Sequence, residues 1–338
     1  MNLLANRAGA LALALACAAA LVPARAAAPL HPAQAPGWYR TMIGDVEVTA
    51  LLDGTHPFPV DDVMTHATKE EIAALLAASD MARPVEGSIN AFLVNTGARL
   101  VLIDAGAGAL YGDCCGHLLA NLRAAGYDPA QVDDVLLTHL HRDHVGGVAA
   151  GEAMAFPRAT IHVSAAEARY WTSRLEQRRA PAFLSSMFDG AIDSLAPYVA
   201  AERVKTFDGP GPVVPGVRAV GSAGHTPGHT AYAIESRGQT LLAWGDVVHV
   251  ASIQFPQPDV RLKYDSDEDA AEATRRALLA QASRQGWWIA AAHVAFPGLG
   301  HVRARDGAYE WLPAPYTTWL GAPPAAAPTP SPAASGAR

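Results

Sequence analysis

The amino-acid sequence predicts an α/β sandwich, with β-sheets inside and helices outside. Two patterns support this: the early part of the chain is rich in hairpin-like strand pairs, and later strands alternate with helices. Half of the 338 residues are hydrophobic, so the chain can bury a large core. Because of the early hairpins, a purely parallel sheet fits less well than a sandwich.

The strand-like and helix-like runs cover most of the chain. Runs of β-forming and apolar residues predict strands over 46–53, 91–97, 99–106, 132–139, 231–236, 239–246 and 287–293. Helical patterns occupy 69–79, 117–126, 164–177 and 265–283. The last helix begins with acidic residues and carries arginines toward its end, as the helix dipole favours. We therefore expect one folded unit over about residues 37–312, without a linker-like break.

The N-terminal segment has the features of a secretory signal peptide. Arg7 precedes an apolar run over about residues 8–22, and an Ala-x-Ala cleavage pattern follows at 24–26. The run is too short and too rich in alanine for a membrane span. Residues 1–26 are therefore predicted to be removed, which places the mature chain in the periplasm or outside the cell and leaves it without a membrane span. A lipoprotein signal ending at Cys17 is the disfavoured alternative.

The C-terminal segment and the net charge limit the extent of the folded domain and the classes of partner. From Pro313 to Arg338 the chain is a Pro/Ala/Ser tract, for which we predict a disordered tail. Removal of the signal peptide takes away two arginines and changes the net charge from −7 to −9. An acidic surface argues against nucleic acid as a partner. The apolar segment 181–200 indicates a homodimer.

Two cysteines, Cys114 and Cys115, remain after cleavage. Adjacent cysteines bridge each other only in a strained ring, so the pair does not indicate a disulfide scaffold. Two free thiols are expected, with a vicinal disulfide or a link between chains as alternatives.

A dense group of metal-ligand side chains follows the strand over 132–139. In LLTHLHRDHVGG, His139 and His141 are alternate residues at an extended strand end and can converge on one point. Asp143 and His144 come about one turn later and must face a second point nearby. Imidazoles with a carboxylate suit zinc, iron, manganese or cobalt. The motif therefore predicts a metal site.

Three further ligand candidates occur at strand ends or in turns beside strands. His225 lies in the turn GHTPGHT, Asp246 ends the strand over 239–246, and His293 ends the strand over 287–293. Such positions let a rigid sheet hold ligands in place. The chain thus supplies enough ligands for two ions.

Together, THLHRDHVGG, GHTPGHT, AWGD and AAHVAFPGLGH resemble the metallo-β-lactamase fold superfamily, in the family's order over residues 104–301. The resemblance implies an αββα four-layer sandwich of two mixed sheets with flanking helices. It assigns His139, His141 and His225 to one metal. It assigns Asp143, His144 and His293 to the other, with Asp246 between the two ions. It also implies that Asp104 orients a ligand.

Two divalent ions that share a carboxylate can present hydroxide to an ester-type electrophile and stabilise the developing charge. We therefore expect a dinuclear metallohydrolase of a small-molecule substrate. The catalytic residues would be Asp246, between the ions, and Asp143, as the proton carrier. The ions are expected to be Zn²⁺, and Mn²⁺, Co²⁺ or Fe²⁺ also suit these ligands.

Within the superfamily, the chain is most similar to exported methyl parathion hydrolase-like enzymes and lactonases. That resemblance implies an organophosphate triester, lactone or carboxyl ester as substrate, and a pocket lined by Tyr111, Trp171 and Phe188. The sequence alone also fits Trp171 and Phe188 as core residues on helices. Tyr111 stands where phenylalanine is expected, and His249, also expected in the pocket, stands where an aliphatic residue is expected. Both differences make the pocket more polar.

The alternatives are relatives with other activities. True metallo-β-lactamases lack the shared carboxylate, export and acidity disfavour ribonuclease Z, and the Pro/Ala tail replaces the C-terminal domain of glyoxalase II. A mono-iron persulfide dioxygenase-type oxidoreductase would use only the first ligand group. Of the other polar residues, His229 and His301 are expected to support ligands or turns, and His162 to lie in the core. The acidic run 265–272 is interpreted as a solvated helix start.

Overall fold

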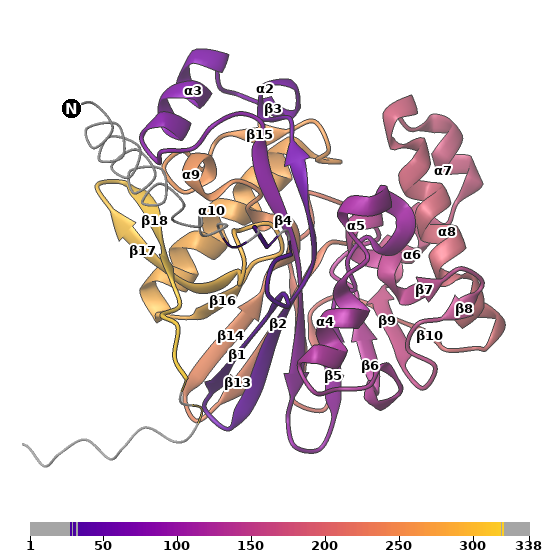
Figure 1. Ribbon diagram of the computed structural model, residues 1–338. Helices are drawn as coiled ribbons and strands as arrows, with labels where there is room; N and C mark the ends of the chain where they lie inside the picture. Colours follow the sequence, from indigo (N-terminus) through magenta and orange to yellow (C-terminus); the bar gives the residue numbers. More distant parts are fainter. Residues whose placement is uncertain (1–27, 29, 32, 319, 321–338) are drawn as a thin grey trace, which may run out of the picture. The chain divides into compact units, whose positions relative to one another are not determined.

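Two seven-stranded mixed sheets form the inner layers (Figure 1). The first sheet contains, in spatial order, β1 (Trp38–Ile43), β2 (Val46–Phe58), β4 (Val85–Asn95), β5 (Leu100–Ile103), β6 (Asp134–Leu136), β9 (Thr160–Ser164) and β10 (Val204–Phe207). Its first four strands pair antiparallel, and its last three continue parallel to β5. The computed structural model describes residues 28, 30–31, 33–318 and 320, so the predicted signal peptide and the tail beyond 320 lie outside the described residues.

The second sheet contains β11 (Gly211–Val214), β12 (Val217–Gly221), β13 (Thr230–Ser236), β14 (Gln239–Ala243), β16 (Trp288–Ala290), β17 (Leu299–Arg305) and β18 (Ala308–Pro313). Only β14 and β16 pair in parallel, because α10 (Glu268–Gln285) connects them. Both sheets are therefore mixed, as the sequence predicts.

Apolar side chains from both sheets meet in a shared core. Val48, Phe92 and Ile103 of the first sheet pack in one buried cluster with Tyr232 and Leu241 of the second. Each of these strands alternates its side chains between the two faces of its sheet, so the opposite face must be covered as well. Helices provide that cover.

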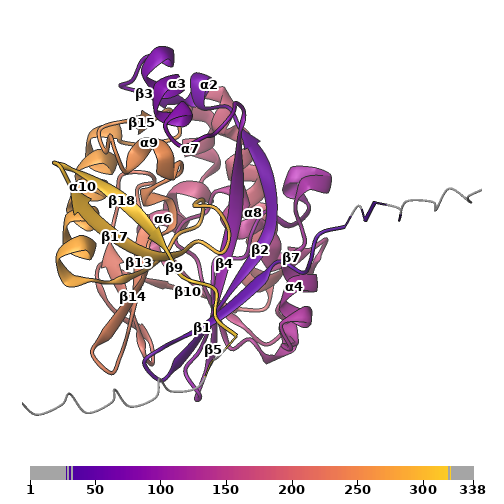
Figure 2. The ribbon, with the colours of Figure 1, turned by 60° about the vertical axis from the view of Figure 1, so that its left-hand side comes forward.

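The outer face of the first sheet packs against α4 (Leu118–Ala124), α6 (Ala165–Trp171) and α8 (Ser185–Ala200), and α7 (Arg174–Arg179) lies against α8. The outer face of the second sheet packs against α10. Figure 2 shows α10 beside β17 and β18. The predicted αββα layering is therefore confirmed.

A smaller cluster joins segments that are far apart in the sequence. Its helices are α2 (Val60–Val63), α3 (Lys69–Ala77) and α9 (Ala251–Gln254), and its strands are β3 (Met64–Thr65) and β15 (Arg261–Leu262). In both ribbon views this cluster lies at one end of β2 (Figures 1 and 2). It therefore borders the strand ends from which the pocket is built.

The helix ends follow local rules. In α3, Thr68 and Glu71 form a reciprocal capping box. In α10, Asp267 accepts a hydrogen bond from the Ala270 amide, and Gly286 ends the helix in the left-handed conformation. These caps fix the start and end of helices whose composition alone leaves the boundaries open by a few residues.

Some expectations differ from the structure. The predicted helix over 164–177 is two helices, α6 and α7, separated at Thr172 and Ser173, and Ser173 caps the second one. The segment 181–200 forms the 3-10 turn η4 (Ala182–Leu184) and the helix α8. It buries most of its apolar side chains, although Phe183 and Val199 remain 52% and 60% exposed. It is therefore not the exposed apolar surface that the sequence indicates, and the homodimer stays a prediction.

The packed part of the chain continues past residue 312. The Ala314 amide donates to the Leu299 carbonyl at 2.8 Å, and the Tyr39 hydroxyl donates to the Pro315 carbonyl at 2.9 Å. Residues 314–315 thus lie against the sheets. Among the described residues, no helix combines the length and apolarity needed to cross a membrane.

Candidate metal centre

The seven predicted ligands come from both sheets and meet at one edge of the sandwich. His139 and His141 follow β6, and the short helix α5 (Arg142–Val145) carries Asp143 and His144. From the second sheet, His225 lies in the turn between β12 and β13, Asp246 follows β14, and His293 follows β16. The sequence therefore folds so that strand ends of the two sheets supply the two halves of one site.

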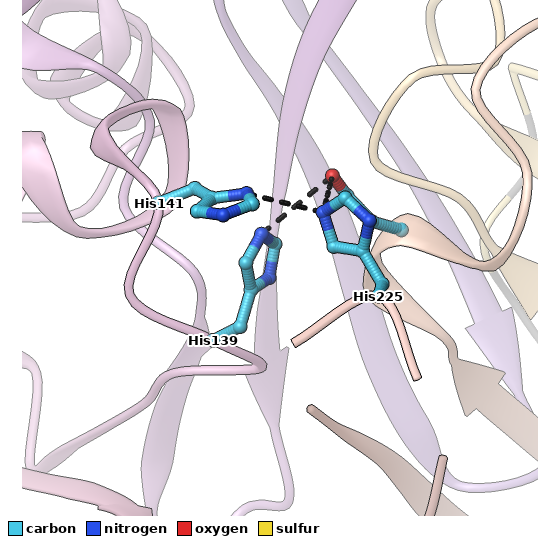
Figure 3. Close-up of side chains that lie close together, drawn as sticks. His139, His141 and His225 are labelled. Atoms are coloured by element: carbon cyan, nitrogen blue, oxygen red, sulfur yellow. Dashed lines mark hydrogen bonds and ion pairs between the residues drawn. The ribbon is translucent and has the colours of Figure 1, made fainter. Parts of the chain in front are cut away.

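The first ligand group contains His139, His141, His225 and Asp246. Nε2 of His225 lies 3.1 Å from Nδ1 of His141 and 3.2 Å from Oδ2 of Asp246. Nε2 of His139 lies 3.6 Å from the same carboxylate oxygen. Figure 3 shows the three imidazole rings pointing toward one another. These atoms can therefore share one small cation.

The second ligand group contains Asp143, His144 and His293. Nε2 of His144 lies 3.3 Å from Nε2 of His293, and these nitrogens lie 3.8 and 3.5 Å from Oδ2 of Asp143. Two histidines and a carboxylate form a ligand set that binds divalent ions. The split of the crowded motif between two points, expected from its spacing, is present in the structure.

Asp246 lies between the two groups. Its Oδ2 faces His139 and His225, and its Oδ1 lies 3.1 Å from Nε2 of His144 and 3.2 Å from Nε2 of His293. Each carboxylate oxygen thus belongs to a different group. This is the arrangement that a carboxylate shared by two ions requires.

Most of the histidines have their outer nitrogen occupied, which leaves the inner nitrogen free for a metal. Nδ1 of His144 bonds to Asp104 at 2.9 Å, Nδ1 of His293 to the Ser88 carbonyl at 2.9 Å, and Nδ1 of His225 to Asp265 at 2.7 Å.

Nδ1 of His139 lies 3.0 Å from the Thr138 hydroxyl, which itself donates to Asp104. The inner Nε2 of His139 is buried and has no hydrogen-bond partner in the described part of the chain. A buried nitrogen without a partner is costly unless something binds it. Outer hydrogen bonds that fix the ring are typical of metal-binding histidines. The residues therefore fit divalent ions.

The pKa shifts of the histidines agree with metal binding at this site. Burial lowers the pKa of His139 well below its usual value, so its ring is neutral and can bind a metal. Burial also opposes protonation of His225 and His144, but neighbouring carboxylates outweigh it. Asp246 and Asp265 raise the pKa of His225 to about 9, and Asp246 and Asp104 raise the pKa of His144. A bound cation would replace these protons.

A cavity of about 390 Å³ opens onto the ligands. Asp143, His225, Asp246 and His293 all line it. The rest of the lining is mixed. Its apolar and aromatic residues are Phe58, Pro59, Ile89, Leu110, Tyr111, Met187 and Tyr264, and its other residues include His56, Gly87, Ser88 and Arg142. The cavity is therefore large enough for a small molecule and gives it direct access to both ligand groups.

Of the four predicted pocket residues, Tyr111 and His249 line the cavity, and Trp171 and Phe188 do not. Both of the latter are fully buried in the core under the first sheet, because α6 and α8 turn these side chains inward. Their placement in the pocket is wrong. Trp171 instead packs edge-on against His141, with ring centres 4.8 Å apart.

His249 lies among the ligands rather than at the outer wall. Its Nε2 is 3.0 Å from Oδ2 of Asp246, and its ring stacks on His293. Burial lowers the pKa of His249 to about 4, so the ring is neutral. Since a carboxylate only accepts, His249 donates to Asp246.

The three predicted supporting residues have different positions. Asp104 holds His144, and His229 accepts a hydrogen bond from the Asp246 amide at 3.0 Å. His301 is placed elsewhere: its Nδ1 bonds to the Trp287 carbonyl at 3.0 Å, and its ring packs on Trp288. It fixes the turn before β16, so of its two expected roles the turn-fixing one fits the structure, and support of a metal ligand does not.

Asp265 is a residue of the site that the sequence did not reveal. We expected the acidic run 265–272 to be a solvated helix start, but the Asp265 carboxylate is buried against His225. The helix α10 begins only at Glu268, so Asp265 belongs to the preceding turn. The acidic run begins just before the helix, but nothing in the sequence distinguishes Asp265 from the other acidic residues of the run.

Two other buried carboxylates were also missed. Glu167 accepts hydrogen bonds from both ligand loops. Asp53 accepts four backbone amides around the 3-10 segment η1 (Gly108–Cys114), which carries Tyr111 into the pocket. Isolated acidic residues in a strand or helix carry no sequence pattern that marks them as buried.

The cysteines lie on the same segment. Cys114 and Cys115 are free thiols with their sulfur atoms 2.9 Å apart. Cys115 packs with Ile89 and Tyr111, which line the pocket. Burial raises the pKa of the Cys115 thiol, so it is a poor nucleophile at neutral pH.

Comparison with solved structures gives similar proteins over most of the chain. A structure described as the hydrolase AbOPH in the beta lactamase superfamily is 38% identical, with a TM-score of 0.81, and the match covers 84% of this chain and all of that one. The dizinc quorum-quenching lactonase AidC, in complex with an acyl-homoserine product, is 27% identical with a TM-score of 0.77, over 83% of this chain and 98% of that one.

A curated relative, the probable metallo-hydrolase Rv2300c of Mycobacterium tuberculosis, is 31% identical over 202 residues. That match covers 48% of this chain and 60% of the relative's length. The family model of the metallo-beta-lactamase superfamily matches residues 84–293, well over half of the chain and all seven predicted ligands. The chain therefore belongs to the metallo-beta-lactamase superfamily.

Proposed function

We propose that the protein is a dinuclear metal-dependent hydrolase that cleaves a lactone or another ester-type bond in a small molecule. The observation that carries this proposal is the Asp246 carboxylate, which directs one oxygen to each of two ligand groups at the floor of the pocket. A mono-iron oxidoreductase needs only the first group, whereas this chain builds both.

The residues around the cavity can each take a defined part. Bound divalent ions supply a water nucleophile that is activated at neutral pH and polarise the substrate oxygen. The Asp143 carboxylate is 15% exposed and lines the cavity, so it can accept a proton and pass it to the leaving group. Burial and the charge of Asp143 raise the pKa of Tyr111, so its hydroxyl stays protonated and can donate a hydrogen bond to the substrate.

The substrate class follows from the pocket and its relatives. The apolar part of the lining favours an uncharged acyl or aryl group, while Tyr111, His249 and Arg142 add hydrogen-bonding groups. The similarity to the lactonase AidC supports a lactone. An organophosphate triester, expected for a methyl parathion hydrolase-like enzyme, is the second substrate class to test. We also propose zinc as the ion and export as the location, from the ligand set and the N-terminal sequence.

The test combines metal analysis with a turnover screen. We expect about two zinc equivalents per chain and chelator-sensitive hydrolysis of lactones ahead of aryl phosphotriesters. Asp143→Asn should keep much of its metal and lose most of its turnover, which separates proton transfer from metal binding. One iron per chain, with oxygen uptake and no hydrolysis of any ester, would contradict the proposal.

A further inference from the structure

The helix α6 presents two buried side chains to the first ligand group. Glu167 and Trp171 are four residues apart and therefore lie on the same face of the helix. Both are fully buried. Trp171 contacts the His141 ring. Glu167 bonds to the backbone amide of Leu140, the residue between His139 and His141. The helix is thus placed to act on the ligands without supplying one.

The Glu167 carboxylate joins the two loops that carry the first group. Its Oε1 accepts a hydrogen bond from the Leu140 amide at 3.0 Å, between His139 and His141. Its Oε2 accepts from the Thr226 hydroxyl at 2.8 Å and from the Gly228 amide at 2.9 Å, in the loop of His225. In the described part of the chain these are its hydrogen bonds, and none reaches the residues of the second group.

The loop of His225 lies very close to the helix. A Cβ atom at Gly228 would lie 2.3 Å from the Glu167 backbone nitrogen, which no side chain can occupy. Glycine at this position lets the loop reach the carboxylate. The loop that carries His225 is thus held against α6 by contact as well as by hydrogen bonds.

We infer that Glu167 is a positioning residue for the first metal ion. Its carboxylate sets the distance between the loop of His139 and His141, from the first sheet, and the loop of His225, from the second. A buried carboxylate is costly unless donors surround it, and here three donors do so. The inference rests on the proposed two-metal function and adds that affinity for the first ion depends on Glu167, while affinity for the second does not.

Glu167→Gln tests this inference with little change in volume. The amide keeps one acceptor oxygen and turns an NH₂ group toward a donor, so at least one of the two loops loses its bond. We expect one of the two zinc ions to bind roughly 10–100-fold more weakly, with the other unchanged, as found when supporting partners of metal ligands are removed. Chelator competition and the visible spectrum of the cobalt-substituted protein would follow the two ions separately.

Two further variants keep the result interpretable. Thr226→Val removes one hydrogen bond and leaves the Glu167 carboxylate unchanged. It should lower the affinity for the same ion to a smaller extent. Glu167→Asp keeps the charge on a shorter side chain and should recover part of the loss. Asp134→Asn is the matched control, since Asp134 is a buried carboxylate of the first sheet that bonds to His162 and Arg99 and to neither loop.

The failures are distinguishable. If the wild-type protein binds fewer than two ions, the proposed function fails. If the wild type binds two ions and Glu167→Gln binds both with unchanged affinity, or binds both equally more weakly, the role of Glu167 is refuted.

Discussion

Asp265 and His225 form a buried pair that prepares one ligand for its metal. The Asp265 carboxylate accepts the Nδ1 proton of His225 at 2.7 Å, so Nε2 points toward His141 and Asp246, where a bound cation would replace its proton. The same contact lowers the pKa of Asp265 despite its burial. An aspartate outside the ligand motifs thus decides which nitrogen of His225 faces the site.

Asp265→Asn should weaken zinc binding about 10–100-fold, because the ring loses the partner that fixes its orientation and raises its basicity. Asp267→Asn is the matched control: two residues away, the Asp267 side chain caps α10 by accepting from the Ala270 amide, and it makes no contact with His225 among the described hydrogen bonds. Competition with a zinc-binding dye measures both. Equal zinc affinity in the two variants would show that Asp265 does not support His225.

For single residues, the sequence predicts the candidate metal ligands better than the residues that hold those ligands in place. Motif spacing, strand ends and the family resemblance together predict seven candidate ligands, and the structure brings all seven together. The sequence does not identify Asp265 or Glu167, whose partners are a ring and amides far away in the chain. The family resemblance misplaces Trp171 in the pocket, whereas the sequence alone also fitted a core residue on a helix, which is where the structure has it.

At the level of elements, α5 and the two glycines that follow it pack directly against the loop after β5. The Ala105 amide donates to the His144 carbonyl at 2.8 Å, and a Cβ at Gly147 would lie only 1.9 Å from the Ala105 carbonyl oxygen. The two backbones are in contact where Asp104 reaches His144. The Gly146-Gly147 pair of the motif is therefore a packing requirement.

Gly147→Ala should destabilise the protein by about 3 kcal/mol, since the methyl group must push α5 away from the β5 loop. The substitution should also lower the affinity for the second metal ion, because His144 and Asp143 move with α5. Gly221→Ala, where the added Cβ meets only ordinary contact at 3.5 Å, provides the control. Urea denaturation of both variants measures the effect, and similar midpoints would disprove the packing argument.

Elements with an uninterrupted apolar pattern were predictable, and those with a charged or interrupted pattern were not. The strands that precede the candidate ligands were predicted from apolar runs, and the structure confirms a strand in each of these runs. The hairpin of β17 and β18 was missed because it is rich in charge, with Arg303 and Arg305 paired to Glu310. The helix α8 was missed because Gly190 and Pro197 interrupt its helical pattern.

For the whole molecule, the site exists only when the two sheets pack together. The first sheet supplies His139 to His144, and the second supplies His225, Asp246 and His293. A site assembled from both halves is absent in the unfolded chain, so metal binding is linked to folding.

Removal of the metal should therefore lower the stability of the whole sandwich. With free zinc at 1,000 times its Kd, each ion contributes about 4 kcal/mol to the free energy of unfolding. Thermal unfolding with and without a chelator should show a lower Tm for the stripped protein, in one transition. A Tm that does not respond to zinc would mean that the ligands do not bind it in the folded state.

The metal-free protein should have its greatest stability near neutral pH. The pKa of His225 is raised from 6.5 to about 9, so its contribution is fully present below pH 6.5 and is lost as the pH rises through about 9. Burial lowers the pKa of His229 from 6.5 to about 3 and that of His249 from 6.5 to about 4, so stability also falls as the pH drops from 6.5 toward 4. Urea midpoints of the chelator-treated protein at pH 5, 7 and 9 should therefore pass through a maximum at pH 7. In the zinc-loaded protein the ion replaces the proton on His225, so the loss between pH 7 and 9 should disappear; its persistence would show that zinc does not bind His225.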